Sequence, residues 1–139
     1  MIENVIDAIV IALKREYPTM DVYTENVTQG LETPCFLVLS ISPKNDRFLN
    51  NRYKQKHLID VHYFPRGGRN EINTVFSNLF FTLEEVADLD GNTFRGSEMR
   101  TETVENVGHL LVQYNFFVDM FETREDPMEE ISIKNNVRS

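Results

Sequence analysis

The chain has 139 residues, of which 41% are hydrophobic, including 10 Phe and 5 Tyr, and this suits one domain with a substantial core. Its net charge of −8 is poorly suited to general nucleic-acid binding, because contacts to phosphate need cations. The single cysteine, Cys35, excludes an internal disulfide and fits a reducing compartment. No apolar run of about 18 residues is present to span a membrane.

The charge is distributed unevenly along the chain. Residues 1–70 carry nine Lys or Arg and eight Asp or Glu, whereas residues 71–139 carry five and fourteen. Within the first half, residues 44–69 hold seven bases and two acids. A chain with a basic patch and an acidic patch can stack on copies of itself or on an oppositely charged partner. The alternative is a solvated loop whose charges only confer solubility.

The first predicted element is a helix over residues 2–17, because apolar residues recur at helical spacing and Pro18 follows. Its acidic residues precede its basic pair, the reverse of a secretory signal, so we interpret it as a helix of the folded protein. A short strand is predicted at residues 21–25. A loop over residues 26–34 then leads to a near-continuous apolar strand at residues 35–41, typical of a central strand covered on both faces.

Residues 44–55 are polar and lack clear periodicity, so a long loop is predicted there, with Phe48, Leu49 and Tyr53 embedded in it. Residues 57–64 alternate as a strand. A second helix is predicted over residues 70–86, with Asn70 as its N-cap. Strands at residues 93–104 and 107–121 are predicted to form a hairpin, in which alternate residues from Leu110 to Met120 share one apolar face.

The predicted order is therefore α-β-β-β-α-β-β, followed by a charged tail. Strands that bury one face against two helices make an α+β fold, here a two-layer sandwich of a mainly antiparallel sheet with two helices packed on it. We assign residues 1–122 to this domain and residues 123–139 to a charged C-terminal extension. The extension has no core pattern and is expected to be disordered when alone.

The histidines and the cysteine indicate no catalytic or metal-binding site. His57 and His62 are at odd separation in one predicted strand, so they point to opposite faces. With no HExxH motif and no Cys/His cluster in the sequence, they and His109 are interpreted as surface or rim histidines without a metal. Cys35 begins an apolar strand, where a free cysteine is usually a small buried hydrophobe, not a nucleophile.

Two other groups of polar residues are candidate sites. The turn from Arg66 to Arg69 contains two glycines before a helix and has some phosphate-loop character, but it lacks the spacing of a nucleotide loop, so a flexible connection is favoured. The acidic residues near 84–90 and 122–130 lack a calcium-loop pattern. We therefore predict no catalytic residue, no cofactor and no metal.

The most distinctive segment is Tyr23-Thr-Glu-Asn-Val-Thr-Gln-Gly-Leu-Glu-Thr-Pro-Cys-Phe36. With a later Arg52-Tyr53 pair and a Tyr-Phe-Pro strand end at residues 63–65, it resembles the phage tail terminator family of Gram-positive phages and prophages. The resemblance spans roughly residues 2–121. The residues that carry the motif are Gln29, Gly30, Pro34, Cys35 and Phe36.

The resemblance implies a non-enzymatic structural protein that forms a ring, usually hexameric, on the top of the tail tube. Its implied partners are other copies of itself, the tail tube protein, the sheath protein in contractile systems, and a neck or connector protein, with DNA passing through the ring without sequence-specific binding. It implies assembly in the bacterial cytoplasm and a place in a virion or a phage-tail-like particle.

Buried aromatic residues and arginines dominate contact energies between proteins. The candidate interface residues are therefore Arg47, Phe48, Leu49, Arg52, Tyr53, Arg66 and Arg69. The nearest alternative function is a head-completion or connector ring of the same neck. A small nuclease and a monomeric binding module are less favoured, because no converging acids or metal ligands can be assembled from the sequence.

Overall fold

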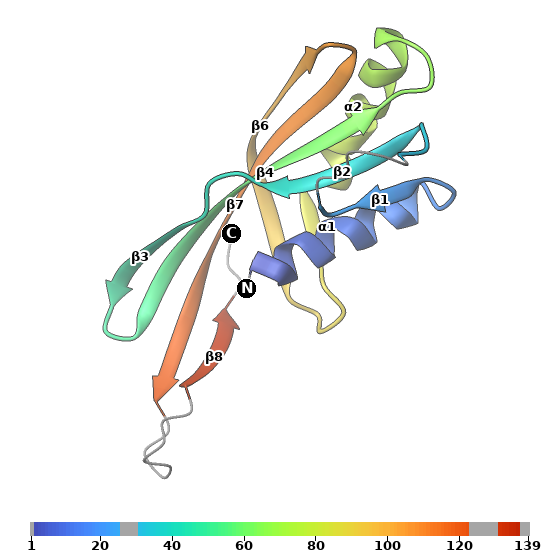
Figure 1. The fold of residues 1–139 in the computed structure, drawn as a ribbon. Helices are drawn as coiled ribbons and strands as arrows, with labels where there is room; N and C mark the ends of the chain where they lie inside the picture. Colours follow the sequence, from blue (N-terminus) through green and yellow to red (C-terminus); the bar gives the residue numbers. More distant parts are fainter. Residues whose placement is uncertain (1, 26–30, 123–130, 137–139) are drawn as a thin grey trace.

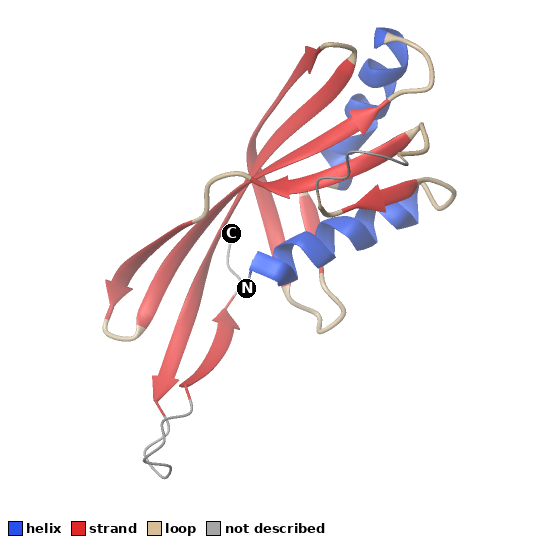
Figure 2. Ribbon diagram, viewed as in Figure 1, coloured by secondary structure: helices blue, strands red, loops and turns tan. Residues whose placement is uncertain are grey.

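A computed structural model describes residues 2–25, 31–122 and 131–136. In these ranges the elements follow the order α1 (Ile2–Glu16), β1 (Asp21–Tyr23), β2 (Cys35–Ser40), β3 (Lys44–Leu49), β4 (Arg52–Phe64), α2 (Arg69–Thr82), β5 (Glu85–Ala87), β6 (Thr93–Val104), β7 (Val107–Glu122) and β8 (Ile131–Asn136). The strands form one mainly antiparallel sheet, and both helices pack on one face of it (Figures 1 and 2). The predicted α+β class is confirmed. No helix in the described ranges has the length and apolar character required to cross a membrane.

Strands β4 and β7 form a long antiparallel ribbon through the middle of the sheet, paired from Arg52↔Asp119 to Tyr63↔Gly108. At one half of this ribbon, β2 pairs with β4 and β6 pairs with β7, and β1 and β5 lie outside them. At the other half, β3 pairs with β4 and β8 pairs with β7. We call the first half, with its helices, the body. The second half, made of β3, β8, residues 52–56 of β4 and residues 115–122 of β7, is the arm.

The body encloses the hydrophobic core between the helices and the sheet. Helix α1 contributes Val5, Ala8, Ile9 and Leu13, and helix α2 contributes Ile72, Val75, Phe76 and Leu79. The alternation predicted for β7 is confirmed, since its residues Leu110, Val112, Tyr114, Phe116 and Val118 are all buried. The one polar group that this row brings into the core is satisfied, because the Tyr114 hydroxyl donates to the Leu83 carbonyl at 2.8 Å.

Helix α2 is shorter than the sequence predicted. It begins at Arg69, with Gly68 and not Asn70 at the N-cap, and ends at Thr82 instead of residue 86. Residues 85–87 form strand β5, in which Val86 is buried opposite Phe94. A continued helix and a short strand both bring Val86 to the core, so its apolar character could not distinguish them.

The prediction of a long loop at residues 44–55 was wrong. Residues 44–49 form strand β3, and β4 begins at Arg52 instead of residue 57. Every residue of β3 is exposed, so no burial imposes an apolar alternation on its sequence. Strand β8 was also not predicted. It lies in the predicted extension, of which residues 123–130 and 137–139 are outside the described residues.

Candidate assembly surface

The arm is a part of the sheet that no helix covers (Figure 1). It continues the ribbon of β4 and β7 beyond the body. Its strand β3 is exposed along its whole length, whereas Phe116 and Val118 of β7 belong to the buried core. A sheet normally buries at least one face against another layer. An uncovered sheet of this kind is therefore a surface that another protein can cover.

Apolar side chains are exposed at the tip of the arm. Phe48 and Leu49 have exposed fractions of 54% and 64%. The Phe48 ring lies edge-on to Phe117, with centroids 5.2 Å apart. The Arg52 guanidinium lies 4.4 Å from the centre of the Phe117 ring, and its Nε is 3.7 Å from Asp119 Oδ1. These contacts hold an aromatic pair and an arginine in a fixed arrangement, the residue types that dominate protein–protein contacts.

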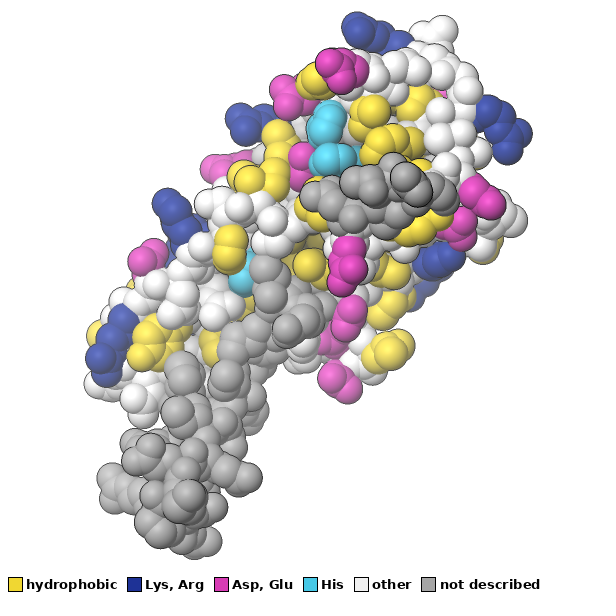
Figure 3. Space-filling view, in the orientation of Figure 1, with side chains coloured by type: hydrophobic (Ala, Val, Ile, Leu, Met, Phe, Trp, Pro, Cys, Tyr) yellow, Lys and Arg dark blue, Asp and Glu magenta, His cyan; other side chains and the backbone are white. Residues whose placement is uncertain are grey.

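The arm is also basic in its described residues. It carries six Lys or Arg, against two Asp at positions 46 and 119 and one Glu at position 122; the bases are Lys44, Arg47, Arg52, Lys54, Lys56 and Lys134. Figure 3 shows basic side chains on the arm. At the β5 edge of the body, the segment 84–90 carries Glu84, Glu85, Asp88 and Asp90. The arm and this segment therefore have opposite charge.

The structure brings together five of the seven predicted interface residues. Arg47, Phe48, Leu49, Arg52 and Tyr53 all lie on the arm, around the turn between β3 and β4. The alternation of β4 places Tyr53 on the face opposite to Arg52, paired with Val118.

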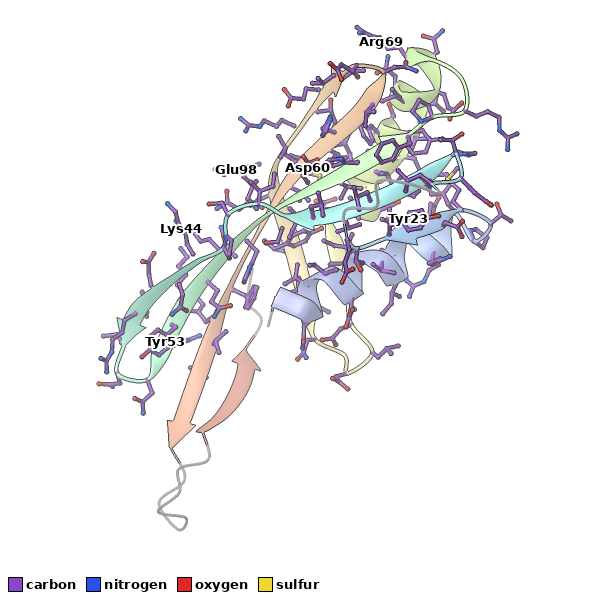
Figure 4. All side chains as sticks on the ribbon, viewed as in Figure 1. Tyr23, Lys44, Tyr53, Asp60, Arg69 and Glu98 are labelled. Atoms are coloured by element: carbon purple, nitrogen blue, oxygen red, sulfur yellow. The ribbon has the colours of Figure 1, made fainter. Side chains whose placement is uncertain are left out.

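The other two predicted interface residues, Arg66 and Arg69, lie far from the arm. They follow the body end of β4, and Figure 4 shows Arg69 and Tyr53 at opposite ends of the molecule. The sequence grouped all seven because they share one basic stretch, but the 13-residue strand β4 separates its two ends. Of the predicted motif residues, Pro34, Cys35 and Phe36 lie at the start of β2, whereas Gln29 and Gly30 lie outside the described residues.

The turn at Arg66 is closed by a carboxylate from the protein itself. Glu71 accepts hydrogen bonds from the backbone N–H groups of Arg66 and Gly67, both at 2.9 Å, and from the Tyr63 hydroxyl. Desolvation raises the pKa of Glu71, but these hydrogen bonds outweigh it and lower the pKa below its usual value. The amides that a phosphate would need are therefore already paired, which favours a structural connection over an anion-binding loop.

Cys35 is completely buried, in agreement with its interpretation as a small hydrophobe. Burial raises the pKa of its thiol. Since the thiolate is the nucleophilic form, both the burial and the raised pKa disfavour a catalytic role.

His57 lies where the arm joins the body. Its ring is 3% exposed and stacks on Phe116 at a centroid distance of 5.1 Å, and its Nε2 lies 3.0 Å from Gln55 Oε1. Burial lowers the pKa of His57 to about 4. The junction of arm and body thus depends on a neutral imidazole.

We expect this junction to make stability pH-dependent. Between about pH 6.5 and pH 4 the unfolded chain protonates His57 while the folded chain does not, so the free energy of unfolding should fall as the pH drops through this window. The loss from this residue should be on the order of 2 kcal/mol. Urea unfolding at several pH values would measure it, with His57→Gln as the comparison. The variant should show a flatter dependence, and parallel curves would contradict the prediction.

The other two histidines form a cluster that the sequence did not reveal. His62 and His109 are directly opposite each other on β4 and β7, with ring centroids 4.3 Å apart. Asp60 Oδ2 lies 3.0 Å from His62 Nε2 and 3.2 Å from His109 Nδ1. The expectation that His57 and His62 point to opposite faces is confirmed. The interpretation of the three histidines as surface or rim residues was wrong for His57, which is buried. It also missed the contact between His62 and His109, because 46 residues of sequence separate two side chains that the strand register brings together.

An α+β domain with an uncovered, basic and apolar arm is typical of structural proteins that assemble with other subunits. Comparison with known families agrees, since residues 4–128 match the sequence model of phage tail terminator proteins. The match covers most of the chain, and the chain therefore belongs to the phage tail terminator family. It is a structural component of a phage tail. A search of curated proteins gave no match.

Proposed function

We propose that the protein forms a ring, most simply of six copies, that caps the tail tube and ends polymerisation of the tube and, in contractile tails, of the sheath. Family membership supports a tail-completion role. The main support for a ring is the uncovered arm, on which the side chains of Phe48 and Leu49 are exposed. An exposed apolar surface on a rigid ribbon is stabilised when another subunit covers it.

The charge distribution supports contact between copies. In a cyclic ring each subunit uses two different surfaces, one to contact the copy before it and one to contact the copy after it. The basic arm and the acidic segment 84–90, at the β5 edge of the body, are two such surfaces. Complementary charges guide the orientation of association more than they add affinity. We therefore place the arm of one copy against the acidic segment, or the adjoining strand β6, of the next copy.

The partners of this ring are the tail tube protein below, the sheath protein in contractile tails, and a neck or connector protein above. DNA passes through the ring without sequence-specific contacts, and acidic residues of β6 such as Glu98 and Glu102 would repel it from the wall. We place assembly in the bacterial cytoplasm and the product in a phage or a phage-tail-like particle. The role is not enzymatic. The family match favours a terminator over a head-completion ring.

Tails assembled without this protein are expected to be overlong or to lack heads. A tube end exposes surfaces that accept another layer, and a cap with a different upper surface removes them. Electron microscopy of particles made with and without the protein would measure tail length and head attachment. Tails of normal length that carry heads in its absence would exclude the terminator role. Particles with heads that leak DNA but with normal free tails would instead indicate a head-completion ring.

A further inference from the structure

The cluster of Asp60, His62 and His109 lies on the face of the sheet opposite to the helices, on the two central strands. Asp60 and His62 are two residues apart on β4 and therefore share a face. His109 on β7 is directly opposite His62. These strands are paired on both sides, so their backbone positions are fixed by the sheet. Figure 4 shows Asp60 near the middle of the ribbon, well away from the tip of the arm.

The three side chains converge on one point. Each offers one donor atom, and the three atoms lie within 4.8 Å of one another. The two shorter separations, 3.0 Å and 3.2 Å, both involve Asp60 Oδ2. Ligand atoms bound about 2.0–2.1 Å from a tetrahedral zinc ion are about 3.4 Å apart. The two separations from Asp60 Oδ2 are close to this value, and no two of the three donor atoms are more than 4.8 Å apart.

The hydrogen bonding of the cluster is uneven without an ion. Both imidazoles direct a nitrogen to the same oxygen, Asp60 Oδ2, while Asp60 Oδ1 is buried with no hydrogen-bond partner among the described residues. A buried carboxylate oxygen without a partner is costly. A cation bound between the three side chains would take the place of the two imidazole N–H groups that face Asp60. Its positive charge would neutralise the Asp60 carboxylate more completely than two neutral N–H groups do.

We propose that Asp60, His62 and His109 bind one divalent transition-metal ion of the Zn²⁺ type. Two imidazoles and one carboxylate form a donor set that suits Zn²⁺ and not Mg²⁺ or Ca²⁺, which prefer oxygen donors. A fourth donor is at hand, since Glu102 on β6 is exposed and lies directly opposite His109 in the strand register. The ion would connect three adjacent strands, β4, β7 and β6, and stabilise the body of the ring subunit.

Histidine NMR on the protein without an affinity tag tests this directly, because the chain contains three histidines. Addition of one equivalent of ZnCl₂ near pH 7.5 should shift the imidazole signals of His62 and His109. The signal of His57, which lies on the other face of β4, should stay in place. No saturable shift of His62 and His109 up to millimolar Zn²⁺ would overturn the proposal, as would equal shifts of all three histidines.

Calorimetric titration of variants gives the second measurement. The full chain should bind one Zn²⁺ and should not bind Mg²⁺ at the same concentration. Asp60→Asn, His62→Gln and His109→Gln should each weaken Zn²⁺ binding at least tenfold, while Glu102→Gln should weaken it less, as expected for a replaceable fourth donor. Ser97→Ala, on the same face of β6, serves as a matched control and should bind normally. Unchanged affinity in Asp60→Asn or His62→Gln would overturn the proposal.

Discussion

Replacing Phe48 and Leu49 together by Ser is expected to abolish incorporation of the protein into tails while leaving the subunit folded. These side chains are more than half exposed in the single chain, so their loss should cost the subunit about 1 kcal/mol or less. In an assembly the same side chains would be buried at a contact, where truncation of a central anchor commonly costs about 2 kcal/mol or more. Repeated around a ring, this loss should prevent closure.

The measurement is the amount of variant in purified tails together with tail length by electron microscopy. Phe81→Ser is a matched control, because Phe81 is 79% exposed but lies on helix α2, outside both the arm and the segment 84–90. It should assemble normally. Arg52→Glu should reproduce the defect, since it removes the cation above the Phe117 ring and places two acids beside each other at Asp119. Normal tails from both arm variants would show that the arm is not the assembly surface.

The largest loss of stability is expected from Gly96→Val. A Cβ at position 96 would lie 2.7 Å from Val112 Cγ2 and 2.8 Å from the Leu83 carbonyl oxygen. The second contact is with backbone, and that same carbonyl accepts the Tyr114 hydroxyl, so it cannot move without breaking a buried hydrogen bond. Overpacking of a core typically costs 1–3 kcal/mol. We expect about 3 kcal/mol here, a large part of the stability of an ordinary domain.

Urea unfolding of the variant against the unsubstituted protein would measure this loss. Gly68→Ala is the control, because a Cβ at position 68 meets no atom within 4 Å. It should lower the free energy of unfolding by no more than about 1 kcal/mol, the difference between Gly and Ala at the N-cap of α2. A loss below about 1 kcal/mol for Gly96→Val would show that β6 does not approach the core as closely as the structure has it.

The parts of the fold that the sequence predicted are those in which burial repeats along the chain. Helix α1 and strand β7 bury one face regularly, so their apolar residues recur at the period of the element. The family also followed from sequence, because it rests on a local segment around Pro34, Cys35 and Phe36 and on a match over residues 4–128. Burial of Cys35 was predicted by the apolar run that it begins.

The parts that the sequence did not predict depend on contacts between distant residues or on exposure of both faces. Strand β3 is exposed throughout, so no pattern distinguishes it from a loop. The split of the seven candidate interface residues into an arm group and a distant pair depends on the length of β4.

The amino-acid sequence alone therefore predicted the α+β class, the core faces and the family, because each depends on residues that are neighbours in sequence or recur at a regular spacing. The tertiary structure decided that residues 44–56 form an uncovered arm and that Asp60, His62 and His109 meet at one point. The register between β4 and β7 brings those side chains together. It depends on how the two strands pair, so it cannot be read from the sequence of either strand alone.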